Sequence, residues 1–155
     1  MKIRLIAVGT RMPDWVSTGY HEFSKRLNDD VRLELVEIAA GKRGKSVDIA
    51  RLTEKEGEAQ LAAVANNDRV ITLEVHGKLW STEDLSQKLR QWLAEGRNIS
   101  LLVGGPEGLS ADASARADEQ WSLSPLTLPH PLVRVLLAEQ IYRAWTLLKG
   151  HPYHR

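Results

Sequence analysis

Short apolar runs rich in Val, Ile and Leu alternate along this chain with segments of helical spacing. The runs cover residues 3–8, 33–38, 70–75 and 99–103, with a weaker fifth at 121–124. Between them, helical spacing of apolar residues covers 15–27, 49–65 and 85–93, and a shorter helix begins at Ser110. This alternation favours an α/β fold with a mainly parallel sheet, helices on both faces and ligand sites at the carboxyl ends of the strands.

The size and composition of the chain exclude several classes of site. Its 155 residues correspond to a single domain, residues 1–155, with a core of its own. Because cysteine is absent, there are no disulfides, thiolate metal sites or cysteine nucleophiles. The net charge of +1 does not by itself indicate a nucleic-acid partner. Without a signal-like start or a long apolar stretch, a cytoplasmic protein with no membrane association is expected.

The last helix is apolar around more of its circumference than one sheet contact requires. It begins near Pro131, a residue suited to the first helical turn. Its apolar residues are Leu132, Val133, Val135, Leu136, Leu137, Ile141, Trp145 and Leu148. A helix on a sheet needs an apolar arc of roughly 100°. The surplus favours a homodimer that covers the other flank, with a fully buried helix as the alternative.

The segment AAGKRGKS, residues 39–46, lies between a predicted strand and a predicted helix and approaches a Walker A phosphate loop. That motif requires glycine where this chain has Ala39, and no later strand ends in an aspartate that could hold magnesium. Nucleotide hydrolysis is therefore disfavoured. Lys42, Arg43 and Lys45 are instead expected to contact phosphates of a large anionic partner, although a polar surface turn would have the same composition.

Two loops after the later strands are candidates for ligand binding. GGPEGLS, residues 104–110, places two glycines at the end of a strand, where backbone can approach a ligand closely, although a tight turn would use the same residues. It lacks the dinucleotide spacing G-x-G-x-x-G. In residues 123–134 three prolines predict a stiff, extended loop. Its leucines could pack on an aromatic ring while its backbone reads the ring's edge, or they could fill the core.

Five segments together resemble one family closely: AVGTRMPDW, EIAAGKRGK, GGPEG, LTLPHPLVRVLLAEQIYRAW and the final HPYHR. The sequence is similar over its whole length to the ribosomal RNA large-subunit methyltransferase H (RlmH) family. The resemblance implies a SPOUT-class fold with a C-terminal trefoil knot, and a homodimer. It also implies methyl transfer from S-adenosylmethionine to N3 of pseudouridine 1915 in 23S rRNA of the assembled ribosome, with S-adenosylhomocysteine as product.

The family's pattern also implies which residues hold the cofactor. They come from the end of the third strand, the glycine turn and the stiff loop: Leu73, Gly104, Gly105, Leu123, Ser124, Pro125, Leu126, Thr127 and Leu128.

The C-terminal tail is expected to act on the RNA base. N3 of a pseudouridine is a poor nucleophile until its proton is lost, so a positioned base or cation should help. His154 is the candidate proton acceptor, Tyr153 would stack on or hydrogen-bond the base, and Arg155 with Arg143 would hold a phosphate or the developing enolate oxygen. Position alone would instead predict a frayed end.

The remaining histidines suggest no further chemistry. His130, between two prolines, is interpreted as shaping the turn rather than as catalytic. His21 and His76 have no partner at metal-ligand spacing, so no metal is expected. A ribosome-associated binding protein without chemistry is the main rival to the methyltransferase hypothesis.

Overall fold

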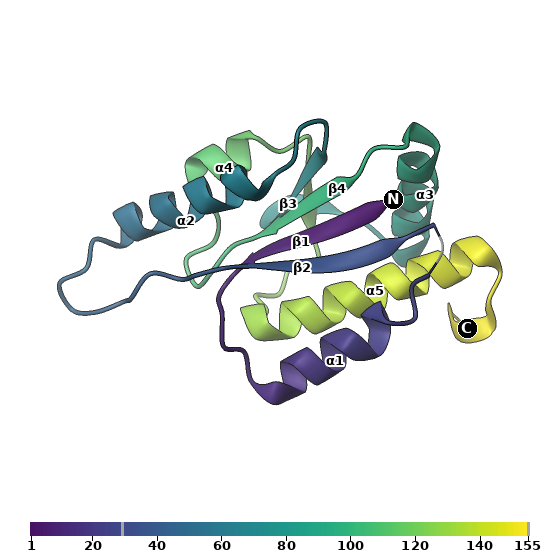
Figure 1. Ribbon diagram of the computed structural model, residues 1–155, viewed down its shortest axis with the longest axis horizontal. Coiled ribbons are helices and arrows are strands. Elements are labelled where there is room, and N and C mark those ends of the chain that lie inside the picture. The colour runs from purple at the N-terminus through teal and green to yellow at the C-terminus, as the bar shows by residue number, and fades with distance from the viewer. Residues whose placement is uncertain (29, 155) are drawn as a thin grey trace.

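The computed structural model describes residues 1–28 and 30–154. Strands and helices alternate along the chain (Figure 1). In order, they are β1 (Lys2–Val8), α1 (Asp14–Ser24), β2 (Arg32–Ile38), α2 (Ile49–Ala63), β3 (Arg69–Leu79), α3 (Thr82–Glu95), β4 (Ile99–Val103), α4 (Ala111–Ala115), β5 (Glu119–Ser122), α5 (His130–Lys149) and a 3₁₀ turn, η1 (Pro152–His154).

The strands form one five-stranded sheet in the order β2-β1-β4-β3-β5, and every neighbouring pair in it is parallel. The predicted parallel α/β sheet is therefore confirmed. Because all strands run the same way, their carboxyl ends meet at one edge of the sheet, on the left in Figure 1. The trefoil knot stays a prediction, since strand order alone does not say how the chain is threaded.

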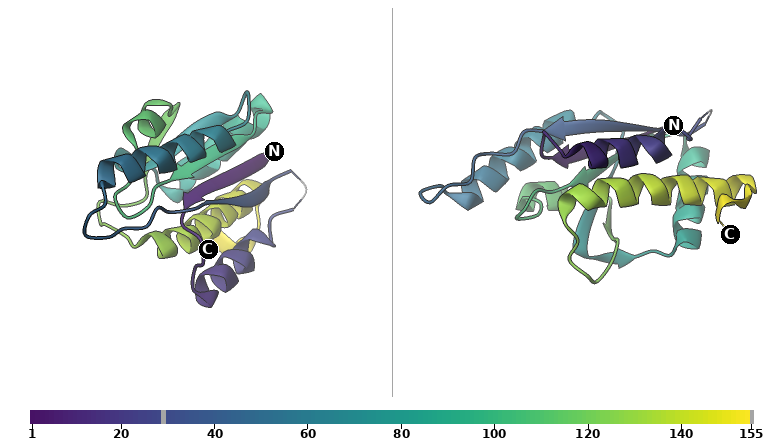
Figure 2. Two further views of the ribbon diagram at one scale, coloured as in Figure 1. Left: turned by 60° about the vertical axis from the view of Figure 1, so that its left-hand side comes forward. Right: turned by 90° about the horizontal axis from the view of Figure 1, so that it is seen from below.

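Helices cover both faces of the sheet, as predicted (Figure 2). On one face α5 packs against α1 and α3, and its Leu137 and Ile141 join a core that includes Leu5 of β1. On the other face α2 and α4 lie over Ile6 and Leu102. Consecutive residues of β1 thus enter opposite layers, as the period of a strand requires. A strand buried on both sides has to be apolar throughout, which is why these runs stand out in the sequence.

Local capping groups fix where several helices begin and end. The Asp48 side chain accepts a hydrogen bond from the N–H of Arg51 and begins α2. Ser81 and Asp84 exchange side-chain and backbone hydrogen bonds in a capping box that begins α3. Gly96 and Gly150 follow α3 and α5 with φ of 71° and 73°, a left-handed conformation that glycine adopts without strain.

Two strands, β3 and β5, differ from the sequence prediction by more than one residue. β3 continues to Leu79 instead of ending at residue 75, and its pairing with β5 shifts register between Leu73 and Lys78. A Cβ on Gly77 would lie 2.6 Å from a backbone atom of Trp121, so the missing side chain lets β3 rejoin its neighbour. β5 begins earlier than expected and ends at Ser122, because the chain then turns into the stiff loop.

Candidate functional site

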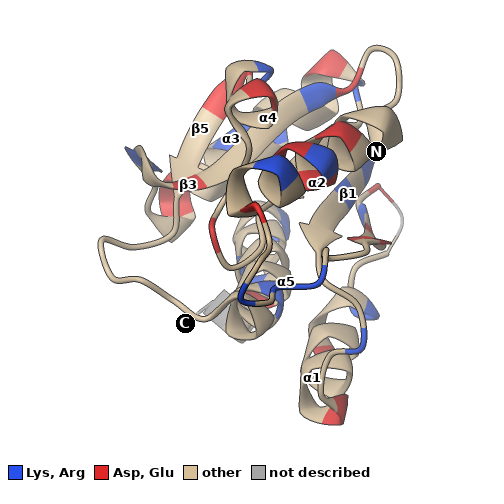
Figure 3. Ribbon diagram, turned by 90° about the vertical axis from the view of Figure 1, so that its left-hand side faces the viewer, with Lys and Arg blue, Asp and Glu red and all other residues tan. Residues whose placement is uncertain are grey.

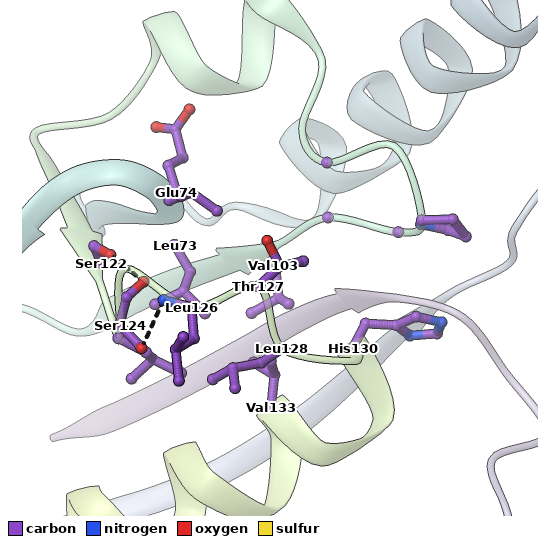
Figure 4. Close-up of a pocket in the computed structure, with 16 residues that line it drawn as sticks. Leu73, Glu74, Val103, Ser122, Ser124, Leu126, Thr127, Leu128, His130 and Val133 are labelled. Atoms are coloured by element: carbon purple, nitrogen blue, oxygen red, sulfur yellow. Dashed lines mark hydrogen bonds between the residues drawn. The ribbon is translucent and has the colours of Figure 1, made fainter.

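A pocket of about 710 Å³, counting the part open to solvent, lies at the carboxyl edge of the sheet (Figure 4). The segments after β4 and β5 and the bulged part of β3 form its walls. They contribute Leu73, Glu74, Val75, Val103, Gly104, Gly105, Pro106, Gly108, Ser122, Leu123, Ser124, Leu126, Thr127 and Leu128, with His130 and Val133 from the first turn of α5. Eight of the nine residues that the family pattern assigned to the cofactor are in this set; Pro125 is not.

The first wall is the turn of residues 104–108, here called the glycine turn. The N–H of Gly108 donates to the carbonyl of Gly105 at 3.0 Å, which closes the turn. A Cβ on Gly104 would lie 2.3 Å from the carbonyl carbon of Gly108 and 2.7 Å from the nitrogen of Leu109. Backbone packs against backbone here, so only glycine fits at position 104.

The second wall is the stiff loop, residues 123–128. Ser124 organises its start: its Oγ accepts from the N–H of Leu126 at 2.9 Å, and its carbonyl accepts from the Ser122 hydroxyl at 3.1 Å. Leu123 and Leu128 pack on the core, whereas Leu126 is 72% exposed. In the described part of the chain, the N–H groups of Thr127 and Leu128 bond to no protein acceptor. The wall therefore pairs an apolar surface with spare backbone donors.

This combination fits the adenosyl part of S-adenosylmethionine. A flat heteroaromatic ring needs apolar side chains against its faces and backbone groups at its edge. If this cofactor binds here, Leu73 and Leu128 would supply the apolar side chains, and the loop backbone would supply the groups at the ring's edge. A Cβ on Gly104 would overlap the backbone of Gly108, so glycine at position 104 lets the turn close beside the pocket.

Glu74 and Val133 belong to the pocket although sequence reasoning did not single them out. Glu74 follows Leu73 directly, and its carboxylate accepts from the hydroxyls of Thr72 and Ser114, each at 2.7 Å. Its side chain points away from the leucines, towards α4 (Figure 4). The only signal for these residues was their place beside a predicted strand end or at the start of the last helix.

His130 lines the pocket with its Nδ1 buried and without a hydrogen-bond partner among the described residues. Burial lowers the pKa of its imidazole, and the charges of Arg134 and Arg43 lower that pKa further. The ring is therefore neutral at physiological pH and does not repel a cationic ligand. Its role in shaping the turn stays a prediction.

His130 should make the protein less stable in acid. Its pKa is lowered on folding, so the unfolded chain binds this proton more readily and stability falls as the pH drops below about 6.5. In urea denaturation at about pH 7, 6 and 5, His130→Gln should lose less unfolding free energy on acidification than the parent. Exposed His21→Gln is the control. Equal acid sensitivity in parent and His130→Gln would contradict this explanation.

Residues 151–153 of the C-terminal tail do not line the pocket of their own chain. Tyr153 packs beside Tyr142 and under the Arg143 guanidinium, 5.0 Å from the ring centroid, and its hydroxyl donates to Glu139 at 3.3 Å. Burial and the Glu139 carboxylate raise the pKa of Tyr153. Tyr153 and Arg143 are thus brought together, but neither lines the pocket. The His154 side chain and Arg155 lie outside the described residues.

Glu139 is a member of this cluster that the sequence analysis missed. Its Oε1 accepts from Nε of Arg143 at 2.7 Å, four residues along α5. The spacing of an acid four residues before an arginine was a visible signal for the pair, but its contact with the tail was not.

The predicted phosphate contacts fall into two kinds. Lys42 and Lys45 are exposed on the loop between β2 and α2. Arg43 is half-buried and binds the carboxylates of Glu56 and Glu107. Figure 3 looks onto this side of the molecule and shows acidic and basic segments adjoining below α2. Only the two lysines present free charge to a partner.

Residues 1–28 and 30–153 contain no group of three side chains suited to hold a metal ion. Within the same part of the chain, none of the helices has the length and apolar character needed to cross a membrane.

Comparison with known proteins identifies the family. A family model described as "Predicted SPOUT methyltransferase" matches residues 1–154. Proteins named ribosomal RNA large subunit methyltransferase H from Pseudomonas fluorescens and Ectopseudomonas mendocina are each 60% identical over 155 residues, the full length of both chains. A crystal structure of a methylase family protein from Neisseria gonorrhoeae shares the fold, with a TM-score of 0.52 and 15% identity over 90% of this chain and 81% of its own. The chain belongs to the SPOUT methyltransferases and, within them, to the ribosomal RNA large subunit methyltransferase H family.

Proposed function

We propose that the protein transfers methyl from S-adenosylmethionine to N3 of pseudouridine 1915 in 23S rRNA of the assembled ribosome. The observation that carries this proposal is the pocket between the glycine turn and the stiff loop, in a chain 60% identical throughout to proteins named for rRNA methylation. Because its substrate is the ribosome, we place the protein in the cytoplasm.

The pocket's own residues bind and orient the donor. Leu73, Leu123, Leu126 and Leu128 would enclose the adenine, and the loop backbone would select its edge. Gly104 and Gly105 line the pocket and would place their backbone against the rest of the cofactor molecule. When bound, the cofactor supplies an electrophilic methyl group and leaves as S-adenosylhomocysteine. The chain's main contribution is alignment, which can account for much of the rate of a displacement.

The acceptor nitrogen N3 must lose its proton to become a good nucleophile, and the tail is our candidate for promoting this loss. His154 would accept the N3 proton, Tyr153 would contact the base, and Arg155 with Arg143 would stabilise the negative charge that develops. Together such groups contribute about 10²- to 10⁴-fold in rate.

We propose that the tail acting on each pocket comes from a second subunit, and chain geometry supports this. The pocket lies at the first turn of α5, and the tail begins after the last residue of that helix. At 1.5 Å per residue, the 20 residues of α5 separate the two ends by about 30 Å. Residues 151–155, even fully extended, span at most about 18 Å. The tail of one chain therefore cannot reach its own pocket while α5 is intact. Two antiparallel α5 helices would bring each tail to the other subunit's pocket.

Surface features support this homodimer. Leu132, Val135 and Leu136 on the flank of α5 are only half-buried, and Trp15 on neighbouring α1 is 56% exposed. A second copy would cover this apolar surface, as the breadth of the apolar arc predicts.

Lys42 and Lys45 are proposed to contact rRNA phosphates. Replacing both with alanine should weaken ribosome affinity and reduce the salt dependence of binding, by a log–log slope of about 0.7–0.9 per lost phosphate contact. Cofactor affinity should be unchanged. Binding of ribosomes at several salt concentrations is the measurement, and a double variant with the parent's affinity and slope would remove these lysines from the interface.

Calorimetry separates the enzyme from its rival, a ribosome-binding protein without chemistry. The methyltransferase should bind S-adenosylmethionine or S-adenosylhomocysteine saturably. If a folded dimer shows no such binding, the proposed enzyme is wrong and the binding protein survives.

A further inference from the structure

Every N–H group of the Arg43 guanidinium is used within the protein. Nη1 and Nη2 donate to the two oxygens of Glu56 at 2.6 Å and 3.0 Å, a bidentate pair. Nη2 and Nε also donate to Oε2 of Glu107 at 2.6 Å and 3.2 Å, and Nη1 donates to the Gly41 carbonyl at 2.9 Å. These five bonds match the five donors of an arginine. Arg43 could bind an RNA phosphate only by releasing one of its present partners.

The two carboxylates belong to different parts of the fold. Glu56 lies on α2 and is only 5% exposed, and its Oε2 also accepts from the N–H of Gly41. Glu107 lies in the glycine turn, between Pro106 and Gly108, both of which line the pocket. Arg43 therefore ties the loop between β2 and α2 to α2 on one side and to the pocket wall on the other.

α2 is a firm support for this tie. One turn beyond Glu56, the buried Gln60 amide donates to the carbonyl of Ile6 in β1 at 3.1 Å and to that of Val103, the last residue of β4, at 3.0 Å. Gly57, which lies between Glu56 and Gln60 on α2, packs so closely on Ser110 that a Cβ there would lie 1.9 Å from the Ser110 hydroxyl, just after the glycine turn. Val103 and Ser110 flank the glycine turn, so α2 holds both of its ends and Arg43 holds its tip.

We propose that Arg43 is a positioning residue for the cofactor pocket: through Glu107 it fixes the glycine turn in the shape that binds S-adenosylmethionine. This inference rests on the proposed function. Arg43 also holds the loop that carries Lys42 and Lys45 beside the pocket. Hydrogen bonds from Arg43 lower the pKa of the Glu107 carboxyl and the arginine charge lowers it further, so the pair is charged at neutral pH.

Lysine cannot replace arginine in this role. Its single ammonium has three donors at one point and cannot make a bidentate pair with Glu56 while it also binds Glu107. Arg43→Lys should therefore weaken cofactor binding about as much as Arg43→Ala. A purely electrostatic contact between Arg43 and RNA would not predict this result.

The test measures cofactor binding by calorimetry with S-adenosylhomocysteine for full-length Arg43→Ala, Arg43→Lys and Glu107→Gln. Each should weaken affinity by about three- to tenfold, the effect of losing one or two charge-assisted hydrogen bonds beneath a binding loop. In methylation assays the cofactor KM should rise, with kcat near the parent value at saturation. Combining Arg43→Lys with Glu107→Gln should add little, because both remove the same link. The Lys42→Ala, Lys45→Ala double variant is the matched control and should keep the parent's cofactor affinity.

Glu107→Gln keeps the test valid if Arg43→Ala, which leaves the buried Glu56 without its partner, does not fold. It removes a charge at the turn and spares the pair with Glu56. If folded Arg43 and Glu107 variants bind the cofactor as the parent does, the positioning role is wrong. If Arg43→Ala instead loses only ribosome affinity, the result expected of the Lys42→Ala, Lys45→Ala double variant, Arg43 is an RNA contact. A parent protein that binds no cofactor would refute the proposed function itself.

Discussion

Ending the chain after Gly150 is expected to lower the rate of ribosome methylation by about 10²-fold or more, because the truncation removes the groups proposed to activate N3. Cofactor affinity should not change, since residues 151–153 do not line the pocket. Single-turnover methylation of unmodified ribosomes at saturating cofactor measures the effect. Loss of Tyr153 also removes its packing on α5, so circular dichroism and sedimentation must first show a folded dimer.

Mixed dimers test whether the tail acts on the partner's pocket. One subunit carries the truncation, and the other has an intact tail but a disabled pocket, through Gly104→Ala. If tails act between subunits, this dimer has one complete site and should retain about half of the parent's rate. If each tail serves its own chain, neither site is complete and the mixed dimer should be inactive. A folded truncated protein that methylates at the parent rate would contradict any catalytic role for the tail.

Gly104→Ala is expected to weaken cofactor binding by about 100-fold, or about 2.7 kcal/mol. The new Cβ would lie 2.3 Å from the carbonyl carbon of Gly108, so the glycine turn must open to accommodate it. Overlap with backbone is not relieved by a side-chain rotation, and the cost falls on the pocket wall. Calorimetry with S-adenosylhomocysteine is the measurement.

The matched control is Gly96→Ala, after α3. Its φ of 71° makes alanine unfavourable by about 1 kcal/mol, but a Cβ there meets nothing within 4 Å and the site is not part of the pocket. It should lower the unfolding free energy and leave cofactor affinity unchanged. Parent-like cofactor affinity in folded Gly104→Ala would show that the glycine turn is not part of the binding site.

The sheet and the location of the pocket could be predicted because both depend on local sequence. Strands buried on two faces must be continuous apolar runs, and glycine or proline after a strand predicts a loop that approaches a ligand. Residues 99–103 followed by Gly104 and Gly105 combine both signals. The family resemblance added the cofactor, which no periodicity indicates.

The remaining features depend on contacts between distant residues. Arg43 and Glu107 are 64 positions apart, and nothing near Arg43 distinguishes it from Lys42 and Lys45, so all three were predicted to contact RNA. The extension of β3 depends on the fit of Gly77 against Trp121. The separation of the tail from its own pocket follows from the length of α5, which becomes meaningful only once the sheet places the start of that helix.

The central claim is tested most directly by incubating the protein with ribosomes that lack the modification and with methyl-labelled S-adenosylmethionine, then mapping the labelled nucleotide. Our account predicts label on N3 of pseudouridine 1915 of 23S rRNA and on no other nucleotide. Absence of label, or label at a different position, with protein shown to be folded and bound to cofactor, would contradict it.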